Sequence, residues 1–576
     1  MKVYRIAPHV HGSMSEGPAS FMAHDHAVAE AGIADAIWWM EHDWRAANCF
    51  KVKAYSFDSE TEYMEIPNRN PKSENPVSQI AMTWRPVAEE TTAEGCRAGI
   101  SRDVVHSGTG SLLIEMPPVS AALRGGQGAA AGGAAHGSAT GAAGAAAGVR
   151  TCVYEFHVEV MHERYPLLSR PKVRLAFFPG EGEAFVRFRL SEQPPDLRHA
   201  ELTYVLGGEG TPKAADKSGT IPLRSKPGEW NVYEFDLAAD VLRLGLPGGL
   251  DNSLHRMYIG LRGGPAGAKA HFDSLQIEPQ VAGPQMLDLQ RELIASLPTR
   301  LVHLVGTEIS YYGQHVNAYG SSVPIPDYEA LLPKRLTTHD IVKHIHDHGG
   351  LASYNHPSIS DPEKTAATLI ENAAYGADLI EIGHQRRGLL ERLQIWDRLG
   401  RAGIILTAVA VSDAHGAAGA WVPRPGKPFY WVTHVWAESL AEADLLEALG
   451  KGRAFVADPE HFRGAIDLRG RSGTRMGDVL VTKGGDTLEA EVDGLQPGDR
   501  VEWVAGGEVA GVSVASEGRV RTRWTAPCRP DGLLPVRIQI VRPSLADAPY
   551  RGLIAVSNPI YLSAAPTGAP RRDVVI

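Results

Sequence analysis

Histidine and carboxylate residues recur at the ends of apolar runs throughout this sequence. His9 and His11 are separated by one residue, and so are Asp413 and His415. In an extended chain, side chains two residues apart point to the same side, so each pair offers two ligand atoms to one cation. Nitrogen and oxygen donors of this kind suit Zn, Mn or Fe rather than Ca. The pattern therefore predicts a transition-metal centre.

Single residues of the same chemical type follow other apolar runs. Glu308 carries two carboxylate oxygens and can therefore bridge two cations. A lone histidine at a strand end is usually a solvated loop residue, so the prediction depends on the joint pattern. The predicted ligands are His9, His11, His42, Glu308, His315, His356, Asp413 and His415.

Such a centre predicts hydrolytic chemistry. A water molecule between the cations would lose a proton near neutral pH and attack as hydroxide. We expect Asp413 to bind metal and to accept a proton, and His42 or His415 to protonate the leaving group where it does not bind metal. His384 and Arg453 are predicted to contact the substrate, although a structural hydrogen bond explains Arg453 equally well.

Parallel strands that alternate with helices would position these residues. Strand candidates that end beside a His, Glu or Asp cover 3–10, 36–40, 301–305, 351–354, 379–382 and 404–411. Helix candidates cover 24–35, 338–348 and about 439–450. The carboxyl ends of the strands in a parallel barrel meet on one face, where active sites lie. We therefore expect the candidate ligands to converge.

Two other stretches have the residue pattern of all-β structure. Between about 47 and 285, short alternating runs are separated by Gly and Pro, which is typical of a β-sandwich. Within it, residues 125–148 contain 11 Ala and 9 Gly out of 24, and this composition predicts a mobile loop. A further β-rich stretch covers 461–562.

Composition excludes several classes of protein. The 576 residues are 43% hydrophobic and 22% charged, as in folded globular proteins, and the net charge of −10 argues against tracking nucleic-acid phosphates. No apolar run reaches the roughly 18 residues of a membrane span. The four cysteines are far apart and no signal-peptide pattern is present, so we expect a cytoplasmic protein. No Gly-x-Ser-x-Gly motif supports a serine hydrolase.

The motifs resemble a known family. His9-Val10-His11, Glu41-His42-Asp43, Gly306-Thr307-Glu308, Asn355-His356-Pro357 and Ser412-Asp413-Ala414-His415 are similar to those of the PHP (polymerase and histidinol phosphatase) superfamily. The resemblance implies a metal-dependent hydrolase on a distorted (βα)7 barrel. Segments 433–436, 452–456 and 557–561 resemble its carbaryl-hydrolase (CehA/McbA-like) branch, and 104–108 and 272–277 look like carbohydrate-binding jelly rolls.

The resemblance also implies roles for the ligands. His9, His11, Glu308 and Asp413 would hold one metal ion, and Glu308, His315 and His356 a second. His42 and His415 would face a third ion or act on the leaving group. The chain departs from the family at Ala7, where Asp is common, and at Met40-Glu41-His42, which replaces Thr-Asp-His. Two or three divalent transition-metal ions are therefore expected.

The fold prediction is α/β: a distorted (βα)7 PHP barrel with an inserted β-sandwich (jelly-roll-like) domain and a C-terminal β domain. The barrel would comprise residues 1–46 and 286–457. The insert would comprise residues 47–285, the C-terminal β domain 458–562 and a tail 563–576.

The substrate prediction is a carboxyl or carbamate ester of a small, aromatic molecule. Lys and Arg are absent from 7–17, 306–317, 353–359 and 411–420, whereas Trp44, Tyr311, Tyr312, Tyr354 and Trp421 lie near the motifs. A PHP-type phosphoesterase is the first alternative, and a carbohydrate-binding or structural protein with an inactive barrel is the second. We expect a small-molecule substrate, no nucleic acid and no membrane, and leave a homo-oligomer open.

Overall fold

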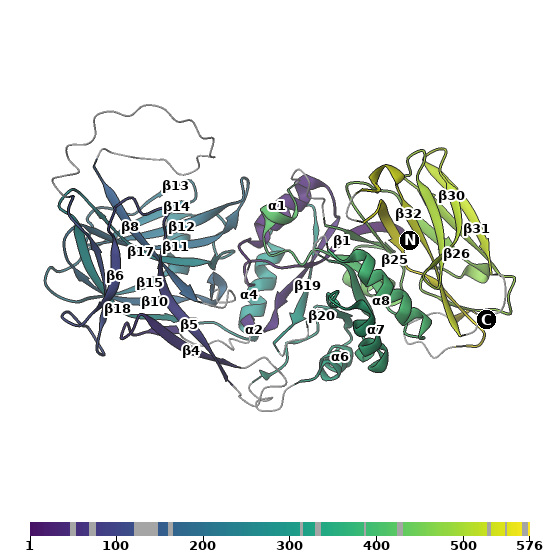
Figure 1. The fold of residues 1–576 in the computed structure, drawn as a ribbon, viewed down its shortest axis with the longest axis horizontal. Helices are drawn as coiled ribbons and strands as arrows, with labels where there is room; N and C mark the ends of the chain where they lie inside the picture. Colours follow the sequence, from purple (N-terminus) through teal and green to yellow (C-terminus); the bar gives the residue numbers. More distant parts are fainter. Residues whose placement is uncertain are drawn as a thin grey trace. The chain divides into compact units, whose positions relative to one another are not determined.

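The computed structural model describes residues 1–15, 17–46, 53–67, 77–119, 148–158, 165–311, 315–328, 336–384, 387–422, 430–526, 532–547, 550–566 and 574–575. These residues belong to two compact units. The first comprises Met1–Ala47, Arg69–Lys72 and Arg291–Ile576, and the second comprises Asn48–Asn68 and Ser73–Gln290 (Figure 1). The finer five-part division stays a prediction. The predicted 125–148 loop, apart from Gly148, lies outside the described residues, as does Tyr312.

The first unit is built on a mixed sheet. Along part of this sheet the strand order is β23-β22-β21-β20-β19-β2-β1-β24-β25. The bounds are β1 Lys2–Val10, β2 Ala36–His42, β19 Val302–Ile309, β20 Val316–Tyr319, β21 Leu351–Tyr354, β22 Leu379–His384, β23 Thr407–Val411, β24 Val432–Ala437 and β25 Ala454–Ala457. β2 is parallel to β1 and β19, and β22 is parallel to β21 and β23.

The predicted mixed α/β architecture is confirmed, and closure into a barrel stays a prediction. β20 is antiparallel to both of its neighbours, which the strand–helix rhythm did not predict. Beyond β23 the chain meets the end of β1: Val10 forms an isolated parallel bridge with Ala414, and the Asp413 N–H donates to the His9 carbonyl at 3.0 Å.

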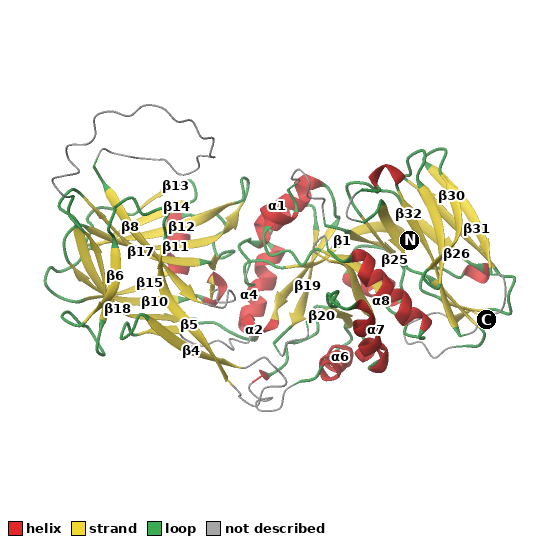
Figure 2. Cartoon of the chain, in the orientation of Figure 1, coloured by secondary structure: helices red, strands yellow, loops and turns green. Residues whose placement is uncertain are grey.

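Helices lie between the strands of this unit along the chain (Figure 2). They are α1 Phe21–Ala31, α2 Asp43–Ala46, α4 Pro284–Ala295, α6 Thr338–Asp347, α7 Pro362–Glu371, α8 Leu389–Arg401, α9 Ala417–Ala420 and α10 Glu442–Gly450. The Ser20 hydroxyl caps α1 by accepting from the Ala23 N–H, and Gly32 ends the helix with φ 60°, a left-handed conformation that glycine adopts readily. None of the described helices is long and apolar enough to cross a membrane.

Strands of this sheet are buried along most of their length. Every residue of β2 is buried, and Ile6, Trp38, Val409 and Leu445 belong to one apolar core. Strands that are covered on both faces consist of nearly continuous apolar residues, so they could be recognised in the sequence.

The C-terminal strands continue this unit, because β25 pairs with β33. Their bounds are β26 Ile466–Arg469, β27 Val479–Val481, β28 Thr487–Asp493, β29 Arg500–Ala505, β30 Glu508–Val514, β31 Arg519–Thr525, β32 Leu533–Val541, β33 Leu553–Ser557, β34 Ile560–Ser563 and β35 Val574–Val575. β26, β28 and β31 form a separate three-stranded sheet. Leu488, Val501 and Ile538 share one core with Phe455 of β25.

The second unit is a β-sandwich of an eight-stranded and a six-stranded sheet, and two further short strands pair with each other in a two-stranded sheet. The strands are β3 Lys53–Tyr55, β4 Thr61–Pro67, β5 Val77–Pro86, β6 Arg97–Ser101, β7 Ser111–Met116, β8 Arg150–Val158, β9 Tyr165–Pro166, β10 Lys172–Pro179, β11 Glu183–Gln193, β12 Arg198–Leu206, β13 Lys213–Ala215, β14 Ser218–Leu223, β15 Asn231–Asp236, β16 Ser253–Leu254, β17 Arg256–Gly263 and β18 Ala268–Glu278, with helix α3 Leu237–Leu244. Phe188 and Ile259 of the larger sheet share a core with Phe272 of the smaller one.

Candidate metal centre

All eight predicted ligands lie together at strand ends of the first unit. Together with a ligand atom of His384, their ligand atoms fall into four groups, within each of which all atoms lie within 4.8 Å of one another. The groups are His11, His42 and His415; His9, His11, Glu308 and Asp413; Glu308, His315 and His356; and His356, His384 and Asp413. Because these groups share members, they form one continuous donor cluster. Their binding of metal remains a prediction from this geometry.

The His9 and His11 imidazoles converge at the buried end of β1. Their Nε2 atoms are 3.0 Å apart, and Asp413 Oδ1 lies 3.4 Å from that of His9 and 3.0 Å from that of His11. Ligand atoms on one tetrahedral zinc ion, with bonds near 2.0–2.1 Å, lie about 3.3 Å apart. The spacing of these three atoms therefore fits a shared cation.

Glu308 offers its two oxygens to different groups. Oε2 lies 3.5 Å from His11 Nε2 and 2.9 Å from His42 Nδ1, whereas Oε1 lies 2.9 Å from His315 Nδ1. Asp413 divides its oxygens in the same way, with Oδ1 toward His11 and Oδ2 2.9 Å from His384 Nε2. Both carboxylates are therefore placed to bridge neighbouring cations.

The group formed by His11, His42 and His415 contains no carboxylate. The His11 ring stacks on those of His42 and His415, with centroids 4.6 Å and 4.0 Å apart. Beside it, burial raises the pKa of Glu41 to about 7 against the lowering effect of its hydrogen bonds from Gly12 N–H and Ser15 Oγ. A divalent ion held by three neutral imidazoles would keep its full positive charge.

Several residues that the sequence analysis missed orient the ligands. Glu381 Oε1 lies 2.7 Å from His9 Nδ1, so a proton on Nδ1 satisfies Glu381 and leaves the Nε2 lone pair for a cation. Ser15 donates to Glu41 and lies 3.0 Å from His11 Nδ1, which favours the same tautomer for His11. A carboxylate inside the apolar run 379–382 is the sequence signal that could have identified Glu381.

Two more hydrogen bonds hold Glu308 and His42. Asn355 Nδ2 donates to Glu308 Oε1 at 2.9 Å, and Ser310 Oγ lies 2.8 Å from His42 Nδ1. Asn355 belongs to a motif quoted from the sequence, whereas Ser310 does not stand out there, because hydroxyl partners follow from tertiary neighbours rather than from spacing.

The buried carboxylates of the cluster need positive charge nearby. Burial opposes ionisation of His9, but Glu381, Glu308 and Asp413 outweigh it and raise the His9 pKa well above its usual value. Burial likewise opposes the charge on Glu308, yet the surrounding histidines, His315 first, hold its pKa well below its usual value. Buried carboxylates of this kind demand positive charge, from protons or from metal ions.

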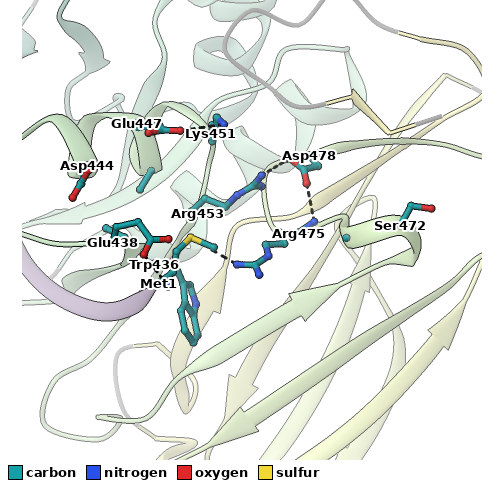
Figure 3. A pocket seen from close by; sticks show the side chains of 13 residues that line it. Met1, Trp436, Glu438, Asp444, Glu447, Lys451, Arg453, Ser472, Arg475 and Asp478 are labelled. Atoms are coloured by element: carbon teal, nitrogen blue, oxygen red, sulfur yellow. Dashed lines mark hydrogen bonds and ion pairs between the residues drawn. The ribbon is translucent and has the colours of Figure 1, made fainter.

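The two predicted substrate contacts lie in different places. His384 joins the donor cluster through Asp413, and its ring lies 4.9 Å from that of His356. Arg453 instead pairs with Asp478 at 2.7 Å in a pocket that Trp436 and Glu438 also line (Figure 3). The substrate role of Arg453 stays a prediction, and its guanidinium makes structural bonds to Asp478 and to the Met476 carbonyl.

Most of the aromatic residues predicted to line an apolar pocket pack inside the protein. Trp44 and Trp421 are buried, and the Trp421 Nε1–H donates to His24 Nδ1 at 2.7 Å. The Tyr311 ring packs against that of Tyr328. Tyr354 lines a pocket beside His315 and His356, in which hydroxyl groups predominate.

No family model and no curated protein matches this sequence. Among solved structures, the chain is similar to a two-domain protein from Bacteroides vulgatus described as containing a predicted PHP-like metal-dependent phosphoesterase. Their identity is 16% over 48% of this chain and 80% of that one, with a TM-score of 0.26.

Two carbohydrate-binding modules also match. The family 11 module from Clostridium thermocellum is 10% identical over 39% of this chain and 98% of its own, with a TM-score of 0.18. The CBM22-1 xylan-binding domain from Paenibacillus barcinonensis Xyn10C is 9% identical over 40% and 94%, with a TM-score of 0.16. At these values the donor set, rather than the matches, carries the functional argument.

Proposed function

We propose that this chain is a metal-dependent hydrolase of ester bonds. The observation that carries the proposal is the pair of buried carboxylates, Glu308 and Asp413, each of which links two groups of donors. When bound there, two or three divalent transition-metal ions would lower the pKa of a water molecule and polarise the scissile bond. We also propose that the chain is related to the carbaryl-hydrolase branch, which its segments 433–436, 452–456 and 557–561 resemble.

The chain's own residues would position the substrate and move protons. Glu381 and Ser15 fix the rings of His9 and His11, so these ligands keep one orientation throughout the reaction. Asp413 Oδ2 faces His384 Nε2 at 2.9 Å, and this pair is placed to take a proton from the attacking water. His415 and His42 remain the candidate proton donors to the leaving group wherever they do not bind metal.

The proposed substrate is an anionic ester, and a phosphoester ranks first. The three-imidazole group would leave a divalent ion with its full charge, which attracts anionic oxygens in a buried, low-dielectric site. The sequence-based preference for an uncharged aromatic ester depended on aromatic side chains, of which Trp44 and Trp421 are buried in packing. Cations in the centre can also take the place of the Arg and Lys clamps that the motifs lack.

A substrate panel and one matched pair of variants test this proposal. Metal-supplemented protein is assayed with 4-nitrophenyl phosphate, bis(4-nitrophenyl) phosphate, 4-nitrophenyl acetate and 1-naphthyl methylcarbamate, and its metal content is measured by elemental analysis. We expect turnover of at least one phosphate compound. Asp413→Asn should abolish it, whereas Asp347→Asn, at an exposed position of α6, should leave it unchanged.

Three outcomes would contradict parts of the proposal. Fewer than one metal ion per chain would remove its basis, and equal turnover by Asp413→Asn would place the chemistry elsewhere. Turnover of the acetate or the carbamate alone would restore the sequence-based substrate ranking and keep the metallohydrolase.

A further inference from the structure

A polar pocket of about 430 Å³ adjoins the candidate metal centre. His315 and His356 line one part of it, and the loop after β21 and the first turns of α7 line the rest. We call it the α7 pocket. Its volume lies within the range of small-molecule sites, which is about 300–1,000 Å³. A substrate whose ester reaches the donor cluster would therefore extend into this pocket.

Hydroxyl groups predominate in the lining of the α7 pocket. Ser358, Ser360, Thr365 and Thr368 all contribute, and Tyr354 is the aromatic member. Ser358 and Ser360 bond to each other through their Oγ atoms at 2.9 Å, and Thr365 Oγ1 donates to the Ser358 carbonyl at 3.0 Å. The loop is thus tied to α7, and the lining presents polar atoms in a fixed arrangement.

Lys364 supplies a positive charge to this lining. Its side chain is exposed, and it forms no ion pair with any residue in the described ranges. Lys343 on α6, by contrast, pairs with Asp347. The acidic residue of the lining, Asp361, accepts from the Lys364 backbone N–H at 3.0 Å as the cap of α7, where the helix terminus offsets its charge.

We propose that the α7 pocket binds an anionic group of the substrate that is separate from the scissile ester, with Lys364 as the counter-charge. Lys364 belongs to none of the donor groups that would hold metal. Its charge would therefore attract an anionic group of the substrate other than the ester at the metal centre. The substrate class is a small molecule with an ester at one end and a carboxylate or phosphate at the other. This inference rests on the proposed function for the ester end only.

A matched pair of synthetic substrates tests this inference. 4-Carboxyphenyl phosphate and 4-carbamoylphenyl phosphate have nearly the same shape and differ in the charge of the distal group. For metal-loaded wild-type protein we expect a KM about three- to fivefold lower for the carboxylate, as for a solvent-exposed charge contact. Should only carboxyl esters turn over, 4-acetoxybenzoate and 4-acetoxybenzamide provide the same comparison.

Three variants assign the difference to Lys364. Lys364→Gln should remove the preference for the carboxylate. Lys364→Arg should retain the preference, and Lys343→Gln should behave as the wild type. Retention of the full preference in Lys364→Gln would overturn the inference, and so would equal KM values for both compounds in the wild type.

A binding measurement separates this inference from the proposed function. Isothermal titration calorimetry of the metal-loaded protein with the two aryl phosphates reports their affinity whether or not they are cleaved. If neither compound turns over but their affinities differ three- to fivefold, and Lys364→Gln abolishes that difference, the proposed function is wrong and the anion pocket is supported. Equal affinities of the wild type for both compounds would sink the anion pocket.

Discussion

The two compact units bury different kinds of side chain in their sheets. The sandwich of the second unit fills its interior with apolar residues, and Phe188, Leu202 and Ile259 are fully buried there. The first unit also has apolar cores, but at its strand ends it buries His9, Glu308 and Glu381 completely. Burial of charge costs free energy unless an opposite charge compensates it. The interior of the sandwich is therefore stabilised mainly by apolar packing, whereas the strand ends of the first unit need positive charge, from protons or from bound cations.

Removal of the bridging charge should have the largest effect on the first unit. Glu308→Gln keeps the shape of the side chain and removes the anion that links two donor groups. We expect hydrolysis to fall at least about a thousandfold, equivalent to roughly 4 kcal/mol of activation free energy, with a loss of bound metal. Rates and elemental analysis report both effects.

The control is Glu447→Gln on the exposed side of α10, which should retain rate and metal content. A Glu308→Gln protein with full metal content and activity would show that the buried charge is structural only.

Truncation in the sandwich should give the opposite pattern. The Phe188 ring is fully buried and packs against the rings of Tyr204 and Phe235. Phe188→Ala should lower the free energy of unfolding of the second unit by about 3–5 kcal/mol through lost burial and the cavity left behind. Metal content per chain should remain unchanged.

Denaturant unfolding measures the loss, and Val232→Ala, at a position 42% exposed, should change the stability by no more than about 0.5 kcal/mol. A parallel loss of metal in Phe188→Ala would mean that the two units do not depend on separate sources of stability.

The strand ends of the first unit could be predicted from the sequence because their geometry is periodic. Residues two apart on a strand share a side, and parallel strands end at a common edge. These two rules were enough to bring His9, His42, Glu308 and Asp413 together from distant parts of the chain. The mixed α/β character and the β-rich stretches followed from the same periodicities.

Features that depend on tertiary neighbours could not be predicted in this way. The antiparallel insertion of β20 between β19 and β21 leaves no signal in the local pattern. The hydrogen bonds of Ser15 and Ser310 to ligand imidazoles have none either. The composition near the motifs cannot distinguish aromatic residues in the core from those lining a pocket, so the substrate prediction stays a prediction.

Metal removal should affect the stability of the two units unequally. A ligand present at 100 times its Kd stabilises the folded state by about 2.7 kcal/mol. Chelation should therefore lower the protection of backbone amides in β1, β19 and β22 against hydrogen exchange and leave β11 and β17 unchanged. Mass spectrometry of exchanged peptides measures both regions in one sample.

Glu308→Gln serves as the control for chelation, since its exchange should no longer respond to added metal. Equal loss of protection in both units on chelation would be incompatible with a cation site confined to the first unit.

The smallest expected effect concerns His434, a buried histidine of the first unit outside the donor cluster. Burial, reinforced by Arg5, lowers its pKa to about 3, whereas carboxylates raise that of His9. In the unfolded chain the pKa returns to about 6.5, so below that pH the unfolded state binds a proton that the folded state does not. Stability from this residue is therefore present above pH 6.5 and lost as the pH falls toward 3.

With chelator present, His434→Gln should remove about 1 kcal/mol of the decrease in unfolding free energy between pH 6 and pH 5. His348→Gln, at an exposed position, should leave that decrease unchanged. An unchanged pH dependence in His434→Gln would mean that this ring is protonated in the folded protein, and that burial and Arg5 do not outweigh the opposing effect of Asp35.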